Sequence, residues 1–417
     1  MRQQLFVSRA LFCVALVVAC SGGGATPSPT GLSLGSNYSD EVPKAALQQV
    51  INGFSASSHI TVTVNTVAAQ QFQERISAYL QANPDDVISW FAGNRMRFFA
   101  EQNLLGDASA AWQTVDSHYS PGIKLASTGS DGKQYLMPFI TYPWAVMYRK
   151  STWQQHGYTP PTTFDELLTL AERMKTDSLV PIAFGDRDGW PAMGYFDILD
   201  LRLNGYDFHG RLLNGTEKWT DQRVVAVFEK WRTLLPYLQP GALGRTWQEA
   251  AQAMVNGQAG MIYLGTFAAE QAAADDRADL DIFTFPLLGT PYDSETAIEA
   301  PINGFMMSAR PANAAGARAF LEYVGGPQAQ VNYVSANPSR IAAALDADTS
   351  GYTPLQQRMS AMISSAGRVA QFFDRDTRPD FAAANGMQSY LQDFLNDPNQ
   401  DLASYLAQIQ RFWDSLP

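Results

Sequence analysis

The sequence has very little cysteine and histidine for its length. Of its 417 residues only two are cysteines, Cys13 and Cys20, and both lie within the first twenty residues. The rest of the chain therefore cannot form a disulfide bond, a thiolate metal site or a cysteine nucleophile. The four histidines are scattered and no HExxH sequence occurs, so a zinc site built on histidine is not expected. We expect no metal and no cofactor.

Other catalytic signatures are also missing. The chain has neither a GxSxG elbow nor a GxxxxGK[ST] loop. Acidic pairs such as Asp85-Asp86 and Asp275-Asp276 are expected to face water rather than to flank a substrate. The segment Asp346–Gly351 begins like a calcium loop, but Gln357 stands where the bidentate glutamate would be. A two-domain glycan-active enzyme remains an alternative, supported only by scattered carboxylates.

Positive charge and long apolar runs are scarce as well. Lysine and arginine number 29 against 40 aspartates and glutamates, which gives a net charge of −11. This balance argues against a protein that binds nucleic-acid phosphates. A marked apolar run, Ala10–Ala19, is about ten residues long and therefore too short to span a bilayer as a helix.

The first residues instead have the pattern of a secretory signal peptide. Arg2 and Arg9 precede the apolar run, which ends in Leu-Val-Val-Ala-Cys. This ending resembles a bacterial lipobox, so we expect residues 1–19 to be removed and Cys20 to be lipidated. An ordinary signal peptide with a chance cysteine is the alternative. Residues 20–31 are rich in Gly, Ser and Pro and are expected to form a flexible linker, which would hold the folded body near a membrane.

The body that follows alternates between strand and helix patterns. Strands are expected at 32–35, 60–67 and 87–91, with amphipathic helices at 43–51 and 71–81 between them. This β-α-β-α-β order predicts a mainly parallel sheet with right-handed crossovers. The later segment 134–148 is apolar but contains Pro138 and Pro143, which argue against a central strand and suit a segment that passes from one sheet to another.

The stretch Trp247–Glu270 is a second landmark. Thr246 and Glu249 form a capping-box pattern, and Trp247, Ala250, Ala251 and Met254 recur at helical spacing. Residues 259–264 read as a buried strand, and a second helix is expected to start at Phe267. A strand that ends in a tight turn before a helix directs backbone N–H groups toward the usual ligand crevice of an α/β sheet, so Phe267 is expected at its edge.

Several short motifs occur in an order that resembles a known family. The chain looks like a family 1 extracellular solute-binding protein of a bacterial ABC importer, the group that includes maltose-binding protein and sugar-binding lipoproteins. The resemblance covers residues 32–413. The motifs are Asp86–Trp90, Met147–Lys150, Pro161–Leu167, Ala253–Met261 and Ala319–Tyr323.

The resemblance implies an α/β, two-lobed periplasmic-binding-protein-like (type II) fold that closes around a ligand. Lobe 1 would comprise residues 32–140 and 285–337, and lobe 2 residues 141–284 and 338–417. The crossing segments would lie near 140–144, 283–286 and 337–341.

The resemblance also implies ligand-binding residues on loops at the cleft. These would be Asn37, Tyr38, Ser39, Phe91, Asn94, Arg95, Tyr142, Trp144, Asp188, Trp190, Thr266, Phe267, Asn303, Arg378, Asp380 and Phe381. Aromatic rings suit the apolar face of a pyranose, and Asp, Asn and Arg suit its hydroxyls. Trp90, in mid-strand, and Trp413 are expected in the core instead, whereas Trp144 fits either role.

We therefore expect a monomeric, non-catalytic receptor that delivers a mono- or oligosaccharide to an ABC permease. It would act outside the cytoplasm and touch the membrane only through its lipid. The main alternative is the same fold binding another solute: a glycerophosphodiester, a polyamine or an organic anion. A cleft dominated by carboxylates would favour a polyamine, and a cluster of Arg and Lys would favour an anion.

Overall fold

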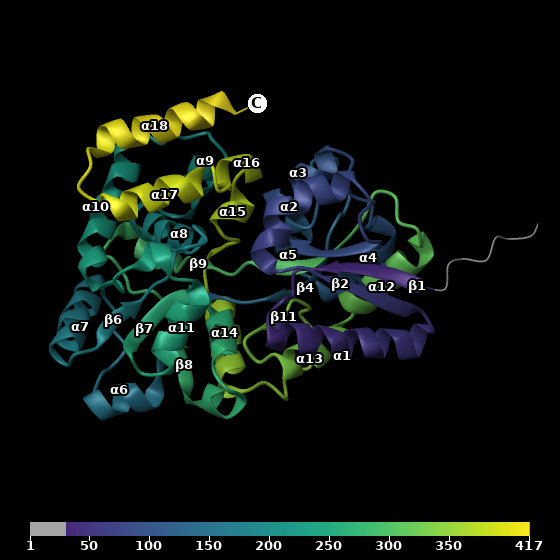
Figure 1. The fold of residues 1–417 in the computed structure, drawn as a ribbon, viewed down its shortest axis with the longest axis horizontal. Helices are drawn as coiled ribbons and strands as arrows, with labels where there is room; N and C mark the ends of the chain where they lie inside the picture. Colours follow the sequence, from purple (N-terminus) through teal and green to yellow (C-terminus); the bar gives the residue numbers. More distant parts are fainter. Residues whose placement is uncertain (1–30, 417) are drawn as a thin grey trace, which may run out of the picture.

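The computed structural model describes residues 31–416, which form two α/β lobes lying side by side (Figure 1). Lobe 1 is the half built around a six-stranded sheet, and lobe 2 the half built around a four-stranded sheet. In spatial order the strands of lobe 1 are β11 (Ile341–Ala342), β4 (Met137–Thr141), β10 (Ile302–Met307), β3 (Val87–Phe91), β1 (Gly31–Ser36) and β2 (Thr61–Thr66). Those of lobe 2 are β6 (Val180–Ala183), β7 (Ala259–Gly265), β5 (Trp144–Arg149) and β8 (Leu280–Phe283).

Helices flank both sheets. Lobe 1 carries α1 (Glu41–Ser58), α2 (Ala69–Gln81), α3 (Asn94–Glu101), α4 (Ser109–Val115), α5 (Pro121–Ala126), α12 (Ala314–Gly325) and α13 (Pro327–Ala336). Lobe 2 carries α6 (Lys150–His156), α7 (Phe164–Thr176), α8 (Pro191–Asn204), α9 (Tyr206–Leu213), α10 (Gln222–Leu234), α11 (Trp247–Val255), α14 (Pro354–Ser365), α15 (Phe373–Asp376), α16 (Pro379–Ala382), α17 (Met387–Asn396) and α18 (Leu402–Ser415).

The first three strands of lobe 1 confirm the predicted alternation. β1 pairs in parallel with both β2 and β3, and α1 and α2 make the connections. Alternate residues of β3 enter different cores: Val87 joins the cluster under α1 and α12, whereas Ile88 and Trp90 join the one under α2 and α3. This two-sided burial explains why β3 is apolar apart from Ser89, whose hydroxyl bonds to Asn37. Trp90 is 1% exposed, as expected for a core residue.

The other strands are mostly antiparallel, so the prediction of a mainly parallel sheet was wrong beyond the first three strands. β10 runs antiparallel to both β3 and β4, and β5 runs antiparallel to β7 and β8. The expectation that the prolines exclude a central strand was wrong for Pro138, which lies in β4 between β10 and β11. It is tolerated because β11 pairs only with Ile140 and Thr141, so the outer side of Pro138 has no ladder partner.

The Trp247–Glu270 stretch folds largely as expected. Thr246 caps α11 by accepting from the Glu249 N–H at 3.1 Å, and β7 follows. The expected second helix is instead a 3-10 segment, Thr266–Gln271. The Thr266 N–H donates to the carbonyl of Pro143 and its hydroxyl to that of Ser339, so neither donor is free for a ligand. These two bonds fix the turn against the crossing segments.

Three segments connect the lobes. The first lies between β4 and β5, at Tyr142 and Pro143, where it was expected. The second follows β9 (Ile298–Glu299), which pairs with β12 (Val369–Ala370) in a separate ribbon. The third follows β11, which still belongs to the lobe 1 sheet. The lobe boundaries stay a prediction. These strand pairings shift the boundary expected at residue 285 to about residue 300, and the boundary expected at residue 338 to beyond residue 342.

The expected signal peptide and the lipidation site at Cys20 lie outside the described residues. Between residues 31 and 416, no helix combines the length and the apolar character that crossing a bilayer requires.

Candidate functional site

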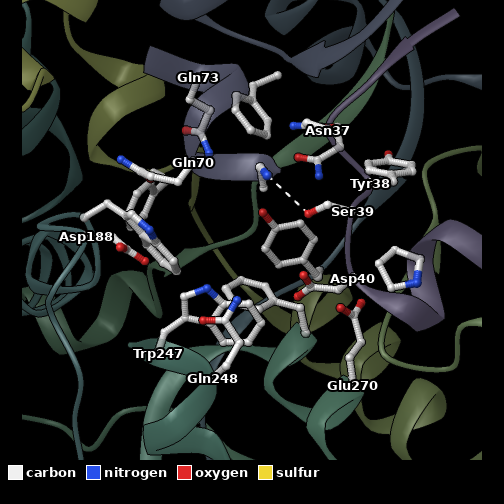
Figure 2. Close-up of a pocket in the computed structure, with 18 of the residues that line it drawn as sticks. Asn37, Tyr38, Ser39, Asp40, Gln70, Gln73, Asp188, Trp247, Gln248 and Glu270 are labelled. Carbon is white, nitrogen blue, oxygen red and sulfur yellow. Dashed lines mark hydrogen bonds between the residues drawn. The ribbon is translucent and has the colours of Figure 1, made fainter. Parts of the chain in front are cut away.

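A cavity of about 310 Å³ lies between the lobes, beside the crossing segments. Figure 2 shows Asn37, Gln70 and Gln73 of lobe 1 facing Trp247 and Gln248 of lobe 2 across it. The volume is at the lower end of the range for small-molecule sites. The cavity therefore suits a small ligand that touches both lobes.

Aromatic side chains make the lobe 2 wall. Trp144, at the start of β5, stacks on Phe372 with ring centroids 4.8 Å apart and planes 16° apart. Phe267 meets the edge of Trp247 at 5.0 Å and lies 6.0 Å from Trp190. Packing among these rings fixes their orientation, so the wall offers preformed apolar faces to a ligand.

A buried ion pair lies beside that wall. Arg340 donates from Nε to Glu270 Oε1 at 3.0 Å, and the two side chains are only 11% and 3% exposed. The guanidinium also lies over the rings of Tyr142, at 4.4 Å, and Phe267, at 5.1 Å. Burial alone would lower the pKa of Arg340, but Glu270 together with Tyr142, Tyr333 and Tyr38 outweighs that effect and raises the pKa. Arg340 is therefore cationic at the cavity.

A second arginine ties the crossing segments together. Arg375 of α15 donates to Asn303 Oδ1 at 2.9 Å and to the Tyr142 hydroxyl at 3.0 Å. Its Nε has no hydrogen-bond partner among residues 31–416 and lies 3.7 Å from Asp374 Oδ1, which also has none. Both atoms are buried, and the ion pair between them leaves each without a hydrogen bond, which is costly in a protein interior.

Lobe 1 contributes a short polar loop after β1. Asn37 accepts from the Ser89 hydroxyl at 2.8 Å, and Ser39 accepts from the Ala69 N–H at 3.2 Å, the bond dashed in Figure 2. Tyr38 is 8% exposed and packs against Phe305 and Tyr333. Tyr38 therefore belongs to the core as much as to the cavity, while the amide of Asn37 is held in place at its edge.

Two carboxylic acids at the cavity have raised pKa values. Burial raises the pKa of Asp40, and the nearby charge of Glu270 adds to this effect. Burial likewise raises the pKa of Asp188, with Arg187 opposing it. Together with Glu270 and Asp374, these acids face Arg187, Arg340 and Arg375 around the cavity. Neither sign of charge dominates.

The structure places most of the predicted site residues together. The cavity is lined by Asn37, Tyr38, Ser39, Phe91, Tyr142, Trp144, Asp188, Trp190, Phe267 and Asn303.

The remaining predicted residues do not line it. Thr266 is buried behind Phe267 and bonded to Ser339. Asn94 donates to the carbonyl of Asp376, and Arg378 forms a bidentate pair with Asp380 at 2.6 Å.

Phe381 is 0% exposed and packs against Trp219 and Trp413, so it is a core residue. Arg95 and Asp380 instead line an adjoining cavity. Trp413 is partly buried and packs against the core, which confirms its expected packing role.

More than half of the wall was not predicted from the sequence. The residues not predicted are Asp40, Pro43, Ala68, Ala69, Gln70, Gln73, Arg187, Trp247, Gln248, Glu270, Arg340, Phe372, Asp374 and Arg375. Trp247 and Glu270 bound the stretch singled out from the sequence, so that signal was available. Arg340, Asp374 and Arg375 come from the C-terminal third of the chain, where no motif distinguished them.

The described residues contain no group of three or more His, Cys, Asp or Glu side chains placed to hold a metal ion. The arrangement offers ring faces, amides and paired charges around a small space. It is chemically suited to reversible binding of a polar molecule by hydrogen bonds and stacking.

Comparisons with known proteins agree with this geometry. The family model for bacterial extracellular solute-binding proteins matches residues 38–331. A solved bacterial solute receptor, AcbH, described as having an exclusive preference for β-D-galactopyranose, is 40% identical, with a TM-score of 0.90 over 92% of this chain and 98% of its own. A chitin oligosaccharide binding protein has the same fold, with a TM-score of 0.82 and 23% identity over 92% and 98% of the two chains.

Curated relatives are more distant. An ABC transporter extracellular-binding protein from Pyrococcus horikoshii is 25% identical over 70% of this chain and 65% of its own length. The chain spans 57% of a second such protein from that organism, so it matches about three-fifths of these two relatives. The α-glucosides-binding protein AglE of Rhizobium meliloti is 22% identical over 84% of this chain and 80% of its own. The chain therefore belongs to the bacterial extracellular solute-binding proteins of family 1, and its fold is the two-lobed type II fold of periplasmic binding proteins.

Proposed function

We propose that this chain is the solute receptor of an ABC importer and that it captures a carbohydrate in the cavity between its lobes. The observation that carries the proposal is the wall of fixed rings beside two arginines whose charges are balanced by acids. A pyranose has an apolar face and a rim of hydroxyls, so it matches both features. Because AcbH is 40% identical over most of the chain, a galactose-type monosaccharide is the first ligand to test.

The charge balance argues against the other solutes. A polyamine would need free carboxylates, but Glu270 is already paired with Arg340 and Asp374 with Arg95 at 2.6 Å. An organic anion or a glycerophosphodiester would need an excess of cations, yet four acids line the same cavity as three arginines. A neutral polyol can instead be held by charge-assisted hydrogen bonds to groups that remain paired. We propose a receptor rather than an enzyme because the relatives named above are binding proteins.

We assign the binding roles as follows. Trp144, Trp190 and Phe267 provide ring faces, and Asn37, Asp188 and Asn303 bind hydroxyls at the edge. Arg340 and Arg375 lie near the crossing segments. Each of them can therefore contact both the ligand and the hinge. Ligand binding is thereby coupled to lobe closure, since a ligand that bridges both walls stabilises the closed arrangement.

The cellular setting follows from the family and the N-terminal sequence. We propose that the body acts outside the cytoplasm as a monomer and delivers its ligand to a membrane permease. Lipidation at Cys20 would keep it at the membrane surface, with the Gly/Ser/Pro segment as a tether. Mass spectrometry of the membrane fraction tests this part: a diacylglycerol adduct on Cys20 supports it, and an unmodified mature N-terminus contradicts it.

Calorimetric titration with D-galactose, D-glucose and D-xylose tests the proposed ligand. We expect saturable binding of at least one sugar and a rise in melting temperature with its concentration. Trp190→Ala should weaken that binding about tenfold through the loss of a ring face. Gln328→Ala, on the exposed surface of α13, is the control and should bind as the parent does. Binding of spermidine or citrate with no response to sugars would overturn the carbohydrate assignment.

A further inference from the structure

A pair of buried carboxyl groups lies where lobe 2 meets the second crossing segment, outside the ligand cavity. Asp197 of α8 and Glu299 of β9 are both 0% exposed and lie within hydrogen-bonding reach of each other. One oxygen of each, Asp197 Oδ1 and Glu299 Oε1, has no hydrogen-bond partner among residues 31–416. Two ionised carboxylates in such contact repel each other, whereas one proton between them is the donor that both groups lack. The pair is therefore suited to sharing a proton.

The charges around the pair do not balance it. His209 Nε2 lies 3.6 Å from Asp197 Oδ1, but its Nδ1 lies only 2.8 Å from Asp200. Arg202 donates to two backbone carbonyls instead of to a carboxylate. The titratable groups that surround the pair are Asp200 and Arg202 of α8, His209 of α9, Tyr263 of β7 and Asp376 of α15. Together with the pair, four acids stand against two bases, so one held proton reduces an excess of buried negative charge.

Each carboxyl group is also tied to a segment that reaches the cavity. Glu299 lies in β9, directly before the crossing to β10, which carries Asn303. Asp197 Oδ2 accepts from the backbone N–H of Phe373 at 2.6 Å, at the start of α15, which carries Arg375. α8 packs against both β9 and α15 (Figure 1). Since Arg375 bonds to Asn303 at the cavity, the buried pair joins α8 to the two segments that meet there.

The proton of the pair is held in the neutral range and lost in alkaline solution. Burial raises the pKa of Glu299 to about 8, although the hydrogen bond from Tyr263 opposes this effect. Burial raises the pKa of Asp197 as well. Above about pH 8 the pair therefore carries a second negative charge. The resulting repulsion acts between α8 and β9, because each of them carries one of the two carboxyl groups.

We propose that the proton shared by Asp197 and Glu299 is a pH-sensitive switch: while it is held, β9 and α15 keep Asn303 and Arg375 at the cavity, and its loss loosens both segments and lowers ligand affinity. The two acids are positioning residues, since neither lines the cavity. The switch acts through backbone segments and does not depend on which solute the cavity binds, so it goes beyond the proposed function.

Calorimetric titration at different pH values tests the effect on binding. The parent would be titrated with D-galactose, D-glucose and D-xylose at pH 6.5, 7.5, 8.5 and 9.5. We expect the affinity for a bound sugar to stay constant up to pH 7.5 and to be at least about threefold weaker at pH 9.5, as the proton is lost. In Glu299→Gln the neutral amide cannot lose a proton in this range, so the ratio of the two affinities should be close to one.

Two control variants separate this pair from other titrating groups. Gln328→Ala, on the exposed surface of α13, should keep the fall seen in the parent. His209→Gln should keep it too, because the carboxyl pair remains. An affinity of the parent that does not change with pH, or a fall that persists in Glu299→Gln, would overturn the switch. A fall removed by His209→Gln but not by Glu299→Gln would assign it to the histidine instead.

Hydrogen exchange tests the switch without a ligand. Peptides that cover residues 297–303 and 372–376 should lose protection between pH 7.5 and 9.5 in the parent, after correction for the intrinsic exchange rate. Glu299→Gln should keep that protection. Unchanged protection in the parent would contradict the switch. If no sugar binds the parent at any pH, the proposed function fails, while the exchange measurement still decides whether the shared proton holds these segments.

Discussion

At the scale of single residues, the chemistry of the cleft depends on arginines whose charges are already paired with acids before a ligand binds. Arg340 and Arg375 both lie on ring faces and both bond to residues near the crossing segments. A charge that is buried and unpaired would be costly, so Glu270 and Asp374 are needed to keep these arginines at the cavity. Under the proposed function, donors that remain unpaired at the cavity would provide specificity for hydroxyls.

A buried histidine outside the cleft leads to a prediction about how the stability of the fold depends on pH. His209 of α9 is 2% exposed, and its Nδ1 lies 2.8 Å from Asp200 Oδ2. Burial alone would lower the pKa of His209, but the bond to Asp200 and the charges of Asp197 and Asp376 outweigh it and raise the pKa to about 9. Between its ordinary value of 6.5 and about 9, the folded state binds this proton more tightly than the unfolded chain.

The contribution of His209 to stability should therefore be complete below pH 6.5 and lost as the pH rises through about 9. The shift corresponds to about 3 kcal/mol. Urea denaturation of the parent and of His209→Gln between pH 5.5 and 9.5 checks this. The variant should be clearly less stable at pH 6, and the difference should shrink toward pH 9.5. A difference that does not change with pH would contradict the assignment.

At the scale of elements, close approach between helices decides the shape of the site. The short helix α15 packs on α8 and α9 of lobe 2 and also against α3 of lobe 1. This contact is possible because Gly93, before α3, has a φ of +80° and no side chain. A Cβ at Gly93 would lie 2.5 Å from the carbonyl oxygen of Arg375. The glycine therefore allows the backbone beside Arg375 to approach lobe 1.

Gly93→Ala should lower stability and ligand affinity together. The positive φ alone costs about 1–3 kcal/mol, and the clash with backbone adds to it. Gly132→Ala is the matched control, because Gly132 has a φ of +81° but nothing within 4 Å of the added carbon. Urea denaturation should show a larger loss for Gly93→Ala. Equal losses for the two variants would mean that the contact with Arg375 has no energetic effect.

At the scale of the whole molecule, contacts between lobes link ligand binding to closure. The Arg95–Asp374 pair and the bond from Asn94 to the Asp376 carbonyl join lobe 1 to α15. These contacts exist only when the lobes are close. They therefore bias the equilibrium between open and closed forms, which the ligand then shifts further.

Arg95→Met should weaken sugar binding about tenfold, because each 1.4 kcal/mol removed from the closed form reduces affinity by that factor. Small-angle scattering should show a larger radius of gyration for this variant at a sugar concentration that closes the parent. Arg318→Met is the control, because Arg318 pairs with Glu322 of the same lobe 1 helix, α12. Equal effects from both variants would argue against a latch between the lobes.

The sequence by itself determined the local architecture. The apolar periods predicted the first three strands, the first two crossover helices and the strand 259–264, and the pairing of Thr246 with Glu249 predicted a capping box. Each of these depends on residues that are close in sequence. The family motifs added the two-lobed fold and ten of the residues that line the cavity.

Only the tertiary structure decided which distant segments meet. Arg340, Asp374 and Arg375 enter the cavity because β11 joins the sheet of lobe 1 and α15 packs across to α3. Pro138 fits an interior strand because its neighbour is two residues long. Phe381 stands beside an Arg-Asp pair in sequence, yet it packs in the core. Such outcomes depend on long-range packing, which local sequence patterns do not encode.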